Sequence, residues 1–286
     1  LMKKNARVFC FVRDRKKVMI ENEELFKKSR SKIYEGEITD KEKMSRIINN
    51  NNIEHIFHLA ANNQNRLLDK ESEIILKTNI IGFVSLLDAC LKKKNIKSII
   101  VVSSKEVKSN RYFELGKVNK HPYAISKLCL ELIANSYIEN FNLPIHIVKF
   151  DNVYGGNDLN FSRLIPSLCK NLMLGKEVNI NNNSKVYKGF IYIDDIVRAM
   201  ELTVENSKKI LLKDCVYFNS KSLYSIMGVY NLVSNMINKE KKNEKTIITK
   251  DNVNFKNNAF FWAANTNFES GLKRTINWYK EFFKVT

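Results

Sequence analysis

The feature that most constrains this chain is an alternation of short, mainly apolar runs with longer helical segments. The apolar runs are at residues 7–12, 53–59, 97–103 and 145–149, and the helical segments at 41–51, 73–94 and 123–140. Continuous apolar runs of this length are typical of parallel strands that are buried on both faces. Strands that alternate with helices favour right-handed crossover units, so we predict an α/β fold with a doubly wound parallel sheet. Such sheets bind ligands at the carboxyl ends of their strands.

The second half of the chain follows a looser rhythm. Helical patterns cover residues 161–174, 193–204, 222–239 and 270–283, and short strands are expected at 190–192, 216–218 and 246–249. We predict a sheet-forming domain over residues 1–151. A smaller α/β lobe that faces the substrate would cover most of 152–286, with some segments returning to the sheet.

The formal net charge of +18 leaves two interpretations open. It fits a nucleic-acid-binding protein, but lysines are spread along the whole chain without interleaved aromatic residues. We therefore favour a general enrichment in lysine, which would also attract an anionic substrate. No apolar run has the length of a membrane span, and no secretory signal pattern occurs. The five cysteines are scattered, which favours a reducing cytoplasm and no metal site.

A tyrosine and a lysine stand four residues apart in a predicted helix, at Tyr123 and Lys127. This spacing places both side chains on one face of the helix. A buried ammonium beside a phenol favours the phenolate, which makes the tyrosine usable as a base near neutral pH. The strand before this helix ends at Ser103 and Ser104, and a hydroxyl there can bond the same substrate oxygen. Taken alone, the tyrosine–lysine spacing is common and fits an ordinary amphipathic helix start.

Further motifs occur in a fixed order along the chain. They are Gly36-Glu37-Ile38-Thr39-Asp40, His58-Leu59-Ala60-Ala61, Thr78-Asn79-Ile80-Ile81-Gly82, Asn152-Val153-Tyr154-Gly155-Gly156, Arg163-Leu164-Ile165-Pro166 and Phe190-Ile191-Tyr192-Ile193-Asp194-Asp195. With Ser104 and the Tyr123/Lys127 pair, this set resembles the extended short-chain dehydrogenase/reductase family, in its NAD-dependent epimerase/dehydratase branch. The stretch from Asn152 to Pro166 is most similar to CDP-glucose 4,6-dehydratase and related nucleotide-sugar 4,6-dehydratases. The resemblance covers nearly the whole chain and implies a Rossmann-type fold.

The resemblance implies a nucleotide-sugar 4,6-dehydratase that uses NAD. Tyr123 would take the proton from the hydroxyl at carbon 4, Lys127 would lower the tyrosine pKa, and Ser104 would bond the sugar oxygen. Water would then be eliminated across carbons 5 and 6, with Glu106 in the position of the base for carbon 5. Lys105 stands where relatives carry the aspartic acid that protonates the leaving hydroxyl.

The resemblance also assigns cofactor contacts. Asp14 would contact the adenosine ribose, and Glu37 and Ile38 would lie at the adenine. Ala60 and Ala61 would lie beneath the cofactor, and Asn79 is a further cofactor contact. Tyr123 and Lys127 would lie at the nicotinamide ribose. Asp14 is equally well interpreted as a solvated charge among its basic neighbours. We expect the family's first strand and glycine-rich pyrophosphate loop to precede Leu1.

For the substrate, the resemblance implies a nucleotide diphosphate sugar. Asn152 and Lys188 would hold the diphosphate, and Arg163 is a further substrate contact. A homodimer built from residues 73–94 and 123–140 of each subunit is expected by analogy. Lys105 and Lys108 depart from the dehydratase pattern and leave two alternatives. One is a nucleotide-sugar 4-epimerase, which needs only Ser104, Tyr123 and Lys127, and the other is a non-catalytic nucleotide-sugar-binding paralogue.

Overall fold

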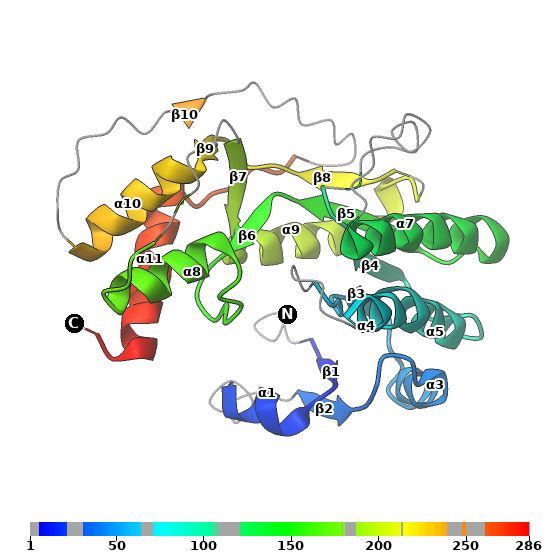
Figure 1. Ribbon diagram of the computed structural model, residues 1–286. Coiled ribbons are helices and arrows are strands. Elements are labelled where there is room, and N and C mark those ends of the chain that lie inside the picture. The colour runs from blue at the N-terminus through cyan, green and yellow to red at the C-terminus, as the bar shows by residue number, and fades with distance from the viewer. Residues whose placement is uncertain are drawn as a thin grey trace. The chain divides into compact units, whose positions relative to one another are not determined.

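The structure is a computed structural model in which residues 6–21, 31–63, 71–105, 107, 121–178, 180, 187–212, 214–238, 248–249 and 261–285 are described. The chain forms two compact units (Figure 1). The first comprises residues 1–148 and 203–215, and the second comprises residues 149–202 and 216–286. The division of roles predicted at residue 151 concerns what each part binds, and it stays a prediction.

The first unit confirms the predicted parallel strands. β3 (His55–His58), β4 (Ser98–Val102) and β5 (Ile145–Phe150) pair in parallel and in sequence order, with β5 continuing into the second unit. β1 (Phe9–Val12) pairs in parallel with β2 (Lys32–Glu35) as a separate two-stranded sheet. Parallel strands need long crossover connections, and the intervening residues supply them as helices.

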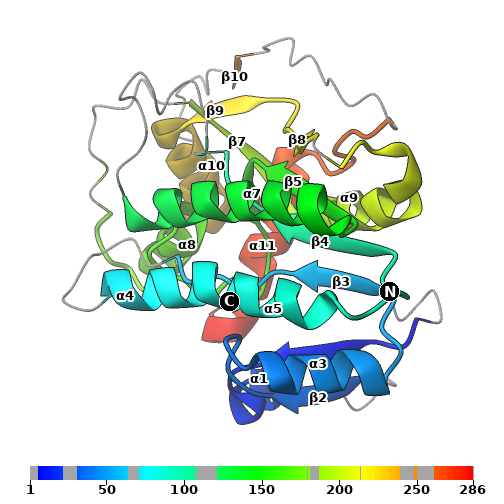
Figure 2. The same cartoon turned by 90° about the vertical axis from the view of Figure 1, so that its right-hand side faces the viewer.

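Helices cover these strands along one side. α3 (Lys41–Asn50) packs on α5 (Gly82–Cys90), and α7 (Pro122–Phe141) lies beside α4 (Glu71–Leu76) and α5 (Figure 2). A short helix, α1 (Arg15–Glu21), follows β1. The helix predicted over residues 73–94 runs from Glu71 to Cys90, and it contains a π-helical turn, η2 (Lys77–Ile81), between α4 and α5.

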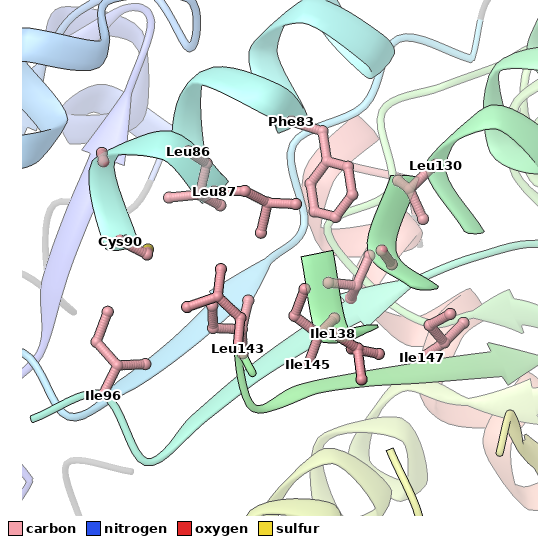
Figure 3. Close-up of a cluster of buried hydrophobic side chains, with 14 of the residues drawn as sticks. Phe83, Leu86, Leu87, Cys90, Ile96, Leu130, Ile138, Leu143, Ile145 and Ile147 are labelled. Atoms are coloured by element: carbon pink, nitrogen blue, oxygen red, sulfur yellow. The ribbon is translucent and has the colours of Figure 1, made fainter. Parts of the chain in front are cut away.

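The core of the first unit lies between helices and strands. Phe83, Leu86 and Leu87 of α5 point toward the apolar face of α7 and toward the strands (Figure 3). Phe83 and Leu87 are fully buried, as are Leu130 of α7 and Ile145 of β5. Burial of a leucine or phenylalanine stabilises the fold by roughly 1.5–3 kcal/mol, so this cluster fixes α7 against β4 and β5.

The second unit is built on a mixed sheet. β6 (Asn152–Tyr154) pairs in parallel with β7 (Tyr187–Tyr192), which pairs antiparallel with β9 (Leu223–Ser225), and β9 pairs with β10 (Ile248–Thr249). β8 (Val216–Phe218) accepts a hydrogen bond from the Asp151 amide at its last residue. The helices described in this unit are α8 (Leu164–Met173), α9 (Ile193–Glu205), α10 (Ile226–Asn238) and α11 (Phe268–Phe283). The last residues of α9 and the 3₁₀ turn that follows it, η3 (Ser207–Lys209), belong to the first unit.

The start of α10 differs from its prediction. The helix expected from residue 222 begins at Ile226, because residues 223–225 form β9 instead. Ser225, Tyr224 and Leu223 face Tyr187, Lys188 and Gly189 of β7 in the antiparallel register. The ladder hydrogen bonds come from a segment about 35 residues earlier, which a local helical pattern does not reveal.

A buried glycine in α11 gives a test of the second unit. A methyl group added at Gly271 would overlap the hydroxyl oxygen of Tyr154 and lie 2.9 Å from its Cζ. Tyr154 is 3% exposed and its hydroxyl donates to the Phe268 carbonyl, so the ring has little room to move. We expect Gly271→Ala to lower the free energy of unfolding by about 1–3 kcal/mol, measured by urea denaturation. Ser270→Ala, at the exposed neighbour, should change it by less than about 0.5 kcal/mol.

Candidate active site

Helix α7 is positioned by its first residues. Pro122 occupies the first helical turn, and the Nδ1 atom of His121 accepts a hydrogen bond of 3.2 Å from the Tyr123 amide. Proline suits this position because the amide it lacks would have no partner within the helix. The helix begins with Tyr123 half-buried and Lys127 one turn later, which confirms the helical spacing of the predicted pair.

Lys127 is unusually well buried for a residue that carries an ammonium group. Its side chain is 4% exposed, its Nζ donates to the Val102 carbonyl at 2.8 Å, and Nζ lies 5.9 Å from the Tyr123 ring centroid. Burial lowers the pKa of Lys127 to about 8, and the Glu131 carboxylate opposes that effect. The structure therefore brings together a phenol and a buried cation, the pair that the sequence predicts.

His58 adds a neutral group to the same neighbourhood. It ends β3, is buried, and its ring stacks on Phe83 at 5.0 Å between centroids. Burial, and to a smaller degree the Lys127 charge, lower the pKa of His58 to about 3. The imidazole therefore remains uncharged at neutral pH and adds no competing positive charge near Tyr123.

Ser104 is the second residue after β4 and is half-buried. The preceding residue, Ser103, donates its amide to the Val148 carbonyl at 2.9 Å, and Val107 donates its amide to the Ser104 carbonyl at 3.1 Å. Ser104 thus lies in a hydrogen-bonded turn at the carboxyl end of β4, within the same unit as Tyr123 and Lys127. Lys105 in this turn is exposed. Glu106 and Lys108, the predicted base and a further departure from the dehydratase pattern, lie outside the described residues.

Asn79 lies in the π-helical turn and is fully buried. Its Oδ1 accepts from the Asn62 amide at 2.7 Å, and its Nδ2 donates to the Asn62 carbonyl at 3.0 Å and to the Ser126 hydroxyl at 2.9 Å. The Ser126 hydroxyl in turn donates to the Tyr123 carbonyl. Isolated π turns occur frequently at functional sites. Asn79 thereby ties the segment after β3 to α7, while its contact with a cofactor stays a prediction.

The remaining predicted cofactor residues follow the carboxyl ends of β1, β2 and β3. Asp14 is exposed and its carboxylate accepts from the Lys17 amide at the start of α1, at 2.9 Å. Glu37 is exposed and Ile38 is half-buried, and a methyl group at Gly82 of α5 would collide with Ile38. These placements allow the predicted contacts and leave the solvated-charge interpretation of Asp14 open as well.

The segment after β3 offers a surface that fits a flat nucleotide. Leu59 is 58% exposed although the preceding residue, His58, is buried, and Ala60 and Ala61 are exposed beside it. Small side chains let a ligand approach the backbone closely, and an exposed leucine loses contact with water when a ring covers it. The residues present therefore fit the nucleotide part of NAD.

The predicted substrate residues lie in the second unit. Asn152, in β6, donates from its side-chain Nδ2 to the Gly189 carbonyl of β7 at 2.9 Å, and the adjacent Lys188 is exposed. The structure thus brings Asn152 and Lys188 onto neighbouring strands. Arg163 instead forms an ion pair of 2.9 Å with Asp158, five residues earlier in the loop before α8. Substrate binding by these three residues stays a prediction.

Sequence reasoning missed the groups that support the Tyr123/Lys127 pair, chiefly Glu131 and His58. Helical spacing offered a signal for Glu131, because it follows Lys127 by four residues, as Lys127 follows Tyr123. Nothing in the local sequence distinguishes the buried His58 from an exposed histidine. In the described part of the chain no helix is long and apolar enough to cross a membrane, and no cluster of histidine, cysteine and acidic residues suits a metal ion.

Comparison with known proteins identifies the family. A family model described as the NAD dependent epimerase/dehydratase family matches residues 1–214. The chain belongs to this family. Among curated relatives in it, a dTDP-D-glucose 4,6-dehydratase of Dictyostelium discoideum is 29% identical over 193 residues, covering 62% of this chain and 44% of the relative. A UDP-glucuronate 4-epimerase of Thermodesulfobacterium geofontis is 26% identical, covering 90% of this chain and 82% of the relative.

Solved structures of epimerases and dehydratases share the fold. The UDP-glucuronic acid 4-epimerase of Bacillus cereus, in complex with NAD, superposes with a TM-score of 0.82 at 20% identity, covering 99% of this chain and 94% of that one. The dTDP-glucose 4,6-dehydratase of Bacillus anthracis, also with NAD, has a TM-score of 0.78 at 21% identity, covering 97% and 89%. The chain spans less than half the length of the first curated relatives it matches. Relatives of both activities occur, so family membership alone does not select one reaction.

Proposed function

We propose that this protein is an NAD-dependent nucleotide-sugar 4,6-dehydratase, which acts on a nucleotide diphosphate sugar. The observation that carries the proposal is the buried Lys127 ammonium, held on the Val102 carbonyl beside the Tyr123 phenol. A fixed positive charge next to a phenol stabilises its phenolate, which suits Tyr123 to accept a proton from an alcohol. Relatives named for nucleotide-sugar dehydration or epimerisation support the substrate class.

In this proposal Tyr123 removes the proton of the sugar hydroxyl at carbon 4, and Ser104 holds the same oxygen by a hydrogen bond. NAD would supply the hydride-transfer chemistry at carbons 4 and 6, while the residues of this chain bind the sugar and move its protons. A ketone at carbon 4 acidifies the hydrogen at carbon 5, which Glu106 would remove. The carbon 6 hydroxyl would leave as water with a proton from Lys105, which stands at the position of the acid. Asp14, Glu37, Ile38, Ala60, Ala61 and Asn79 would hold the cofactor, and Asn152, Arg163 and Lys188 the nucleotide diphosphate.

A nucleotide-sugar 4-epimerase is the second candidate, and Lys105 favours it. This exposed lysine occupies the position of the acid that a dehydratase uses on the leaving hydroxyl. The position therefore holds an ammonium group where the dehydratase pattern has a carboxylic acid. Epimerisation at carbon 4 needs Ser104, Tyr123 and Lys127 but no group at 105 or 106.

The deciding experiment uses the natural full-length protein with NAD and a panel of CDP-, GDP-, dTDP- and UDP-hexoses. Product masses and carbon 4 configuration are followed by mass spectrometry and NMR spectroscopy. We expect one nucleotide sugar to lose the mass of one water. Inversion at carbon 4 without a mass change would establish the epimerase instead. Binding of a nucleotide sugar without either change would contradict both candidates and support the non-catalytic paralogue.

A further inference from the structure

Glu131 continues the row of side chains that begins with Tyr123 and Lys127. The three residues follow one another at intervals of four along α7, so they share one face of the helix. The Ser103 hydroxyl donates a hydrogen bond to the Oε1 atom of Glu131. Ser103 is 5% exposed, so this bond lies largely out of water. Glu131 is therefore anchored to the end of β4, and it does not extend freely into solvent.

Val102 and Ser103, at the end of β4, form hydrogen bonds with Lys127 and Glu131 of α7. The Val102 carbonyl accepts from Lys127, and the Ser103 hydroxyl donates to Glu131. These two bonds hold one face of α7 against the residues that immediately precede Ser104. The position of Tyr123 relative to Ser104 thus depends on contacts made one and two helical turns further along the helix.

The charge on Lys127 needs support in this place. The side chain is almost fully buried, and the carbonyl that it bonds is neutral. Two titratable groups near Lys127 do not supply a negative charge that would stabilise its ammonium. His58 of β3 carries no charge at neutral pH, and Tyr123 of α7 is the phenol whose ionisation Lys127 is proposed to favour. The carboxylate of Glu131 acts in the opposite direction to burial and favours the ammonium. Opposite charges stabilise one another most where water is excluded.

We propose that Glu131 is a positioning residue, which, held by Ser103, keeps the Lys127 ammonium charged and fixed beside Tyr123. Neither Glu131 nor Ser103 needs to touch substrate or cofactor for this role. The ionisation of Lys127 is a property of the folded first unit alone. Its consequence for turnover deepens, and rests on, the proposed function.

The ionisation of Lys127 can be measured without any substrate. The full-length protein is labelled with ¹³C at the ε-carbons of lysine, and the Lys127 signal is assigned by its loss in Lys127→Met. The pKa of Lys127 is then read from an NMR titration. We expect Glu131→Gln to lower this pKa by about one unit, because the amide keeps the shape but not the charge. Ser103→Ala should lower it by a smaller amount, since the carboxylate remains but loses its anchor.

Glu139→Gln is the matched control, because Glu139 is exposed two turns further along the same helix. It should leave the Lys127 titration unchanged. An unchanged pKa of Lys127 in Glu131→Gln would overturn the proposal. If thermal melting shows that Glu131→Gln does not fold, Ser103→Ala decides, and an unchanged pKa there would overturn the proposal as well.

Turnover gives an independent readout. If the protein converts a nucleotide sugar, the alkaline limb of its pH–rate profile should move in Glu131→Gln by the same interval as the Lys127 titration, because the charged form of Lys127 is the active one. A shifted Lys127 titration in a protein that converts no nucleotide sugar would keep the positioning role and reject the proposed function. The two failures are therefore distinguishable.

Discussion

Tyr123→Phe should lower the turnover of the nucleotide sugar by about 10³-fold, since a positioned general base typically contributes 10²–10⁴-fold. The phenol is half-buried at the start of α7, and Lys127 lies 5.9 Å from its ring centroid. Phenylalanine keeps the ring and its packing but has no oxygen to accept the proton of the carbon 4 hydroxyl. Turnover is measured by mass spectrometry of the product, and cofactor binding by titration calorimetry. We expect NAD binding to change much less than turnover.

Tyr137→Phe is the matched control for this loss. Tyr137 lies on the same helix, and its hydroxyl donates to Asp88 at 2.6 Å, so the substitution removes a structural hydrogen bond without touching the candidate site. It should lower the free energy of unfolding by about 1 kcal/mol and leave turnover near its original rate. A Tyr123→Phe variant as active as Tyr137→Phe would reject Tyr123 as the base.

The second large effect is a loss of stability of the first unit in mild acid. Burial, with a smaller effect of Lys127, lowers the pKa of His58 to about 3, and burial lowers the pKa of His146 to about 4. In the unfolded chain both imidazoles return to the ordinary value of 6.5. As the pH falls below 6.5, these histidines bind protons in the unfolded chain but remain neutral in the folded unit. The free energy of unfolding therefore decreases. The decrease ends once the pH is below both folded values.

Between pH 7.5 and pH 4 these two histidines should remove roughly 6 kcal/mol from the free energy of unfolding. This is comparable with the whole stability of a typical domain, about 5–15 kcal/mol, so the unit should unfold in this range. Urea denaturation at a series of pH values measures the loss. The non-titrating variant His146→Leu should remove about half of the pH dependence, whatever its stability at pH 7.5.

His55→Asn serves as the control for the acid effect. His55 is the exposed first residue of β3, and its Nδ1 forms a 2.8 Å hydrogen bond with the Ser98 hydroxyl. Its pKa is also lowered by burial, but that burial is much less complete, so its removal should change the pH dependence less than His146→Leu does. An unaltered pH dependence in His146→Leu would contradict the buried, neutral state of this histidine.

The periodicity of the sequence was sufficient to predict much of the first unit. The mainly apolar runs at residues 97–103 and 145–149 became the parallel strands β4 and β5, in which nearly every residue is buried. The four-residue spacing of Tyr123 and Lys127 required only that the segment be helical, and Pro122 marked where the helix begins. Membership in the NAD dependent epimerase/dehydratase family also followed from the ordered motifs.

Long-range contacts decided what the sequence left open. Residues 223–225 form a strand because β7 supplies their hydrogen-bond partners, and the π turn at Asn79 accompanies buried bonds to Asn62 and Ser126. The ionisation of Lys127 depends on the Val102 carbonyl, the burial of its side chain and the Glu131 carboxylate. Helical spacing alone placed Glu131 on the right face, but only folding against β4 brought it to Ser103. Local spacing determines which side chains share a face, whereas burial and charge depend on distant parts of the chain that pack upon that face.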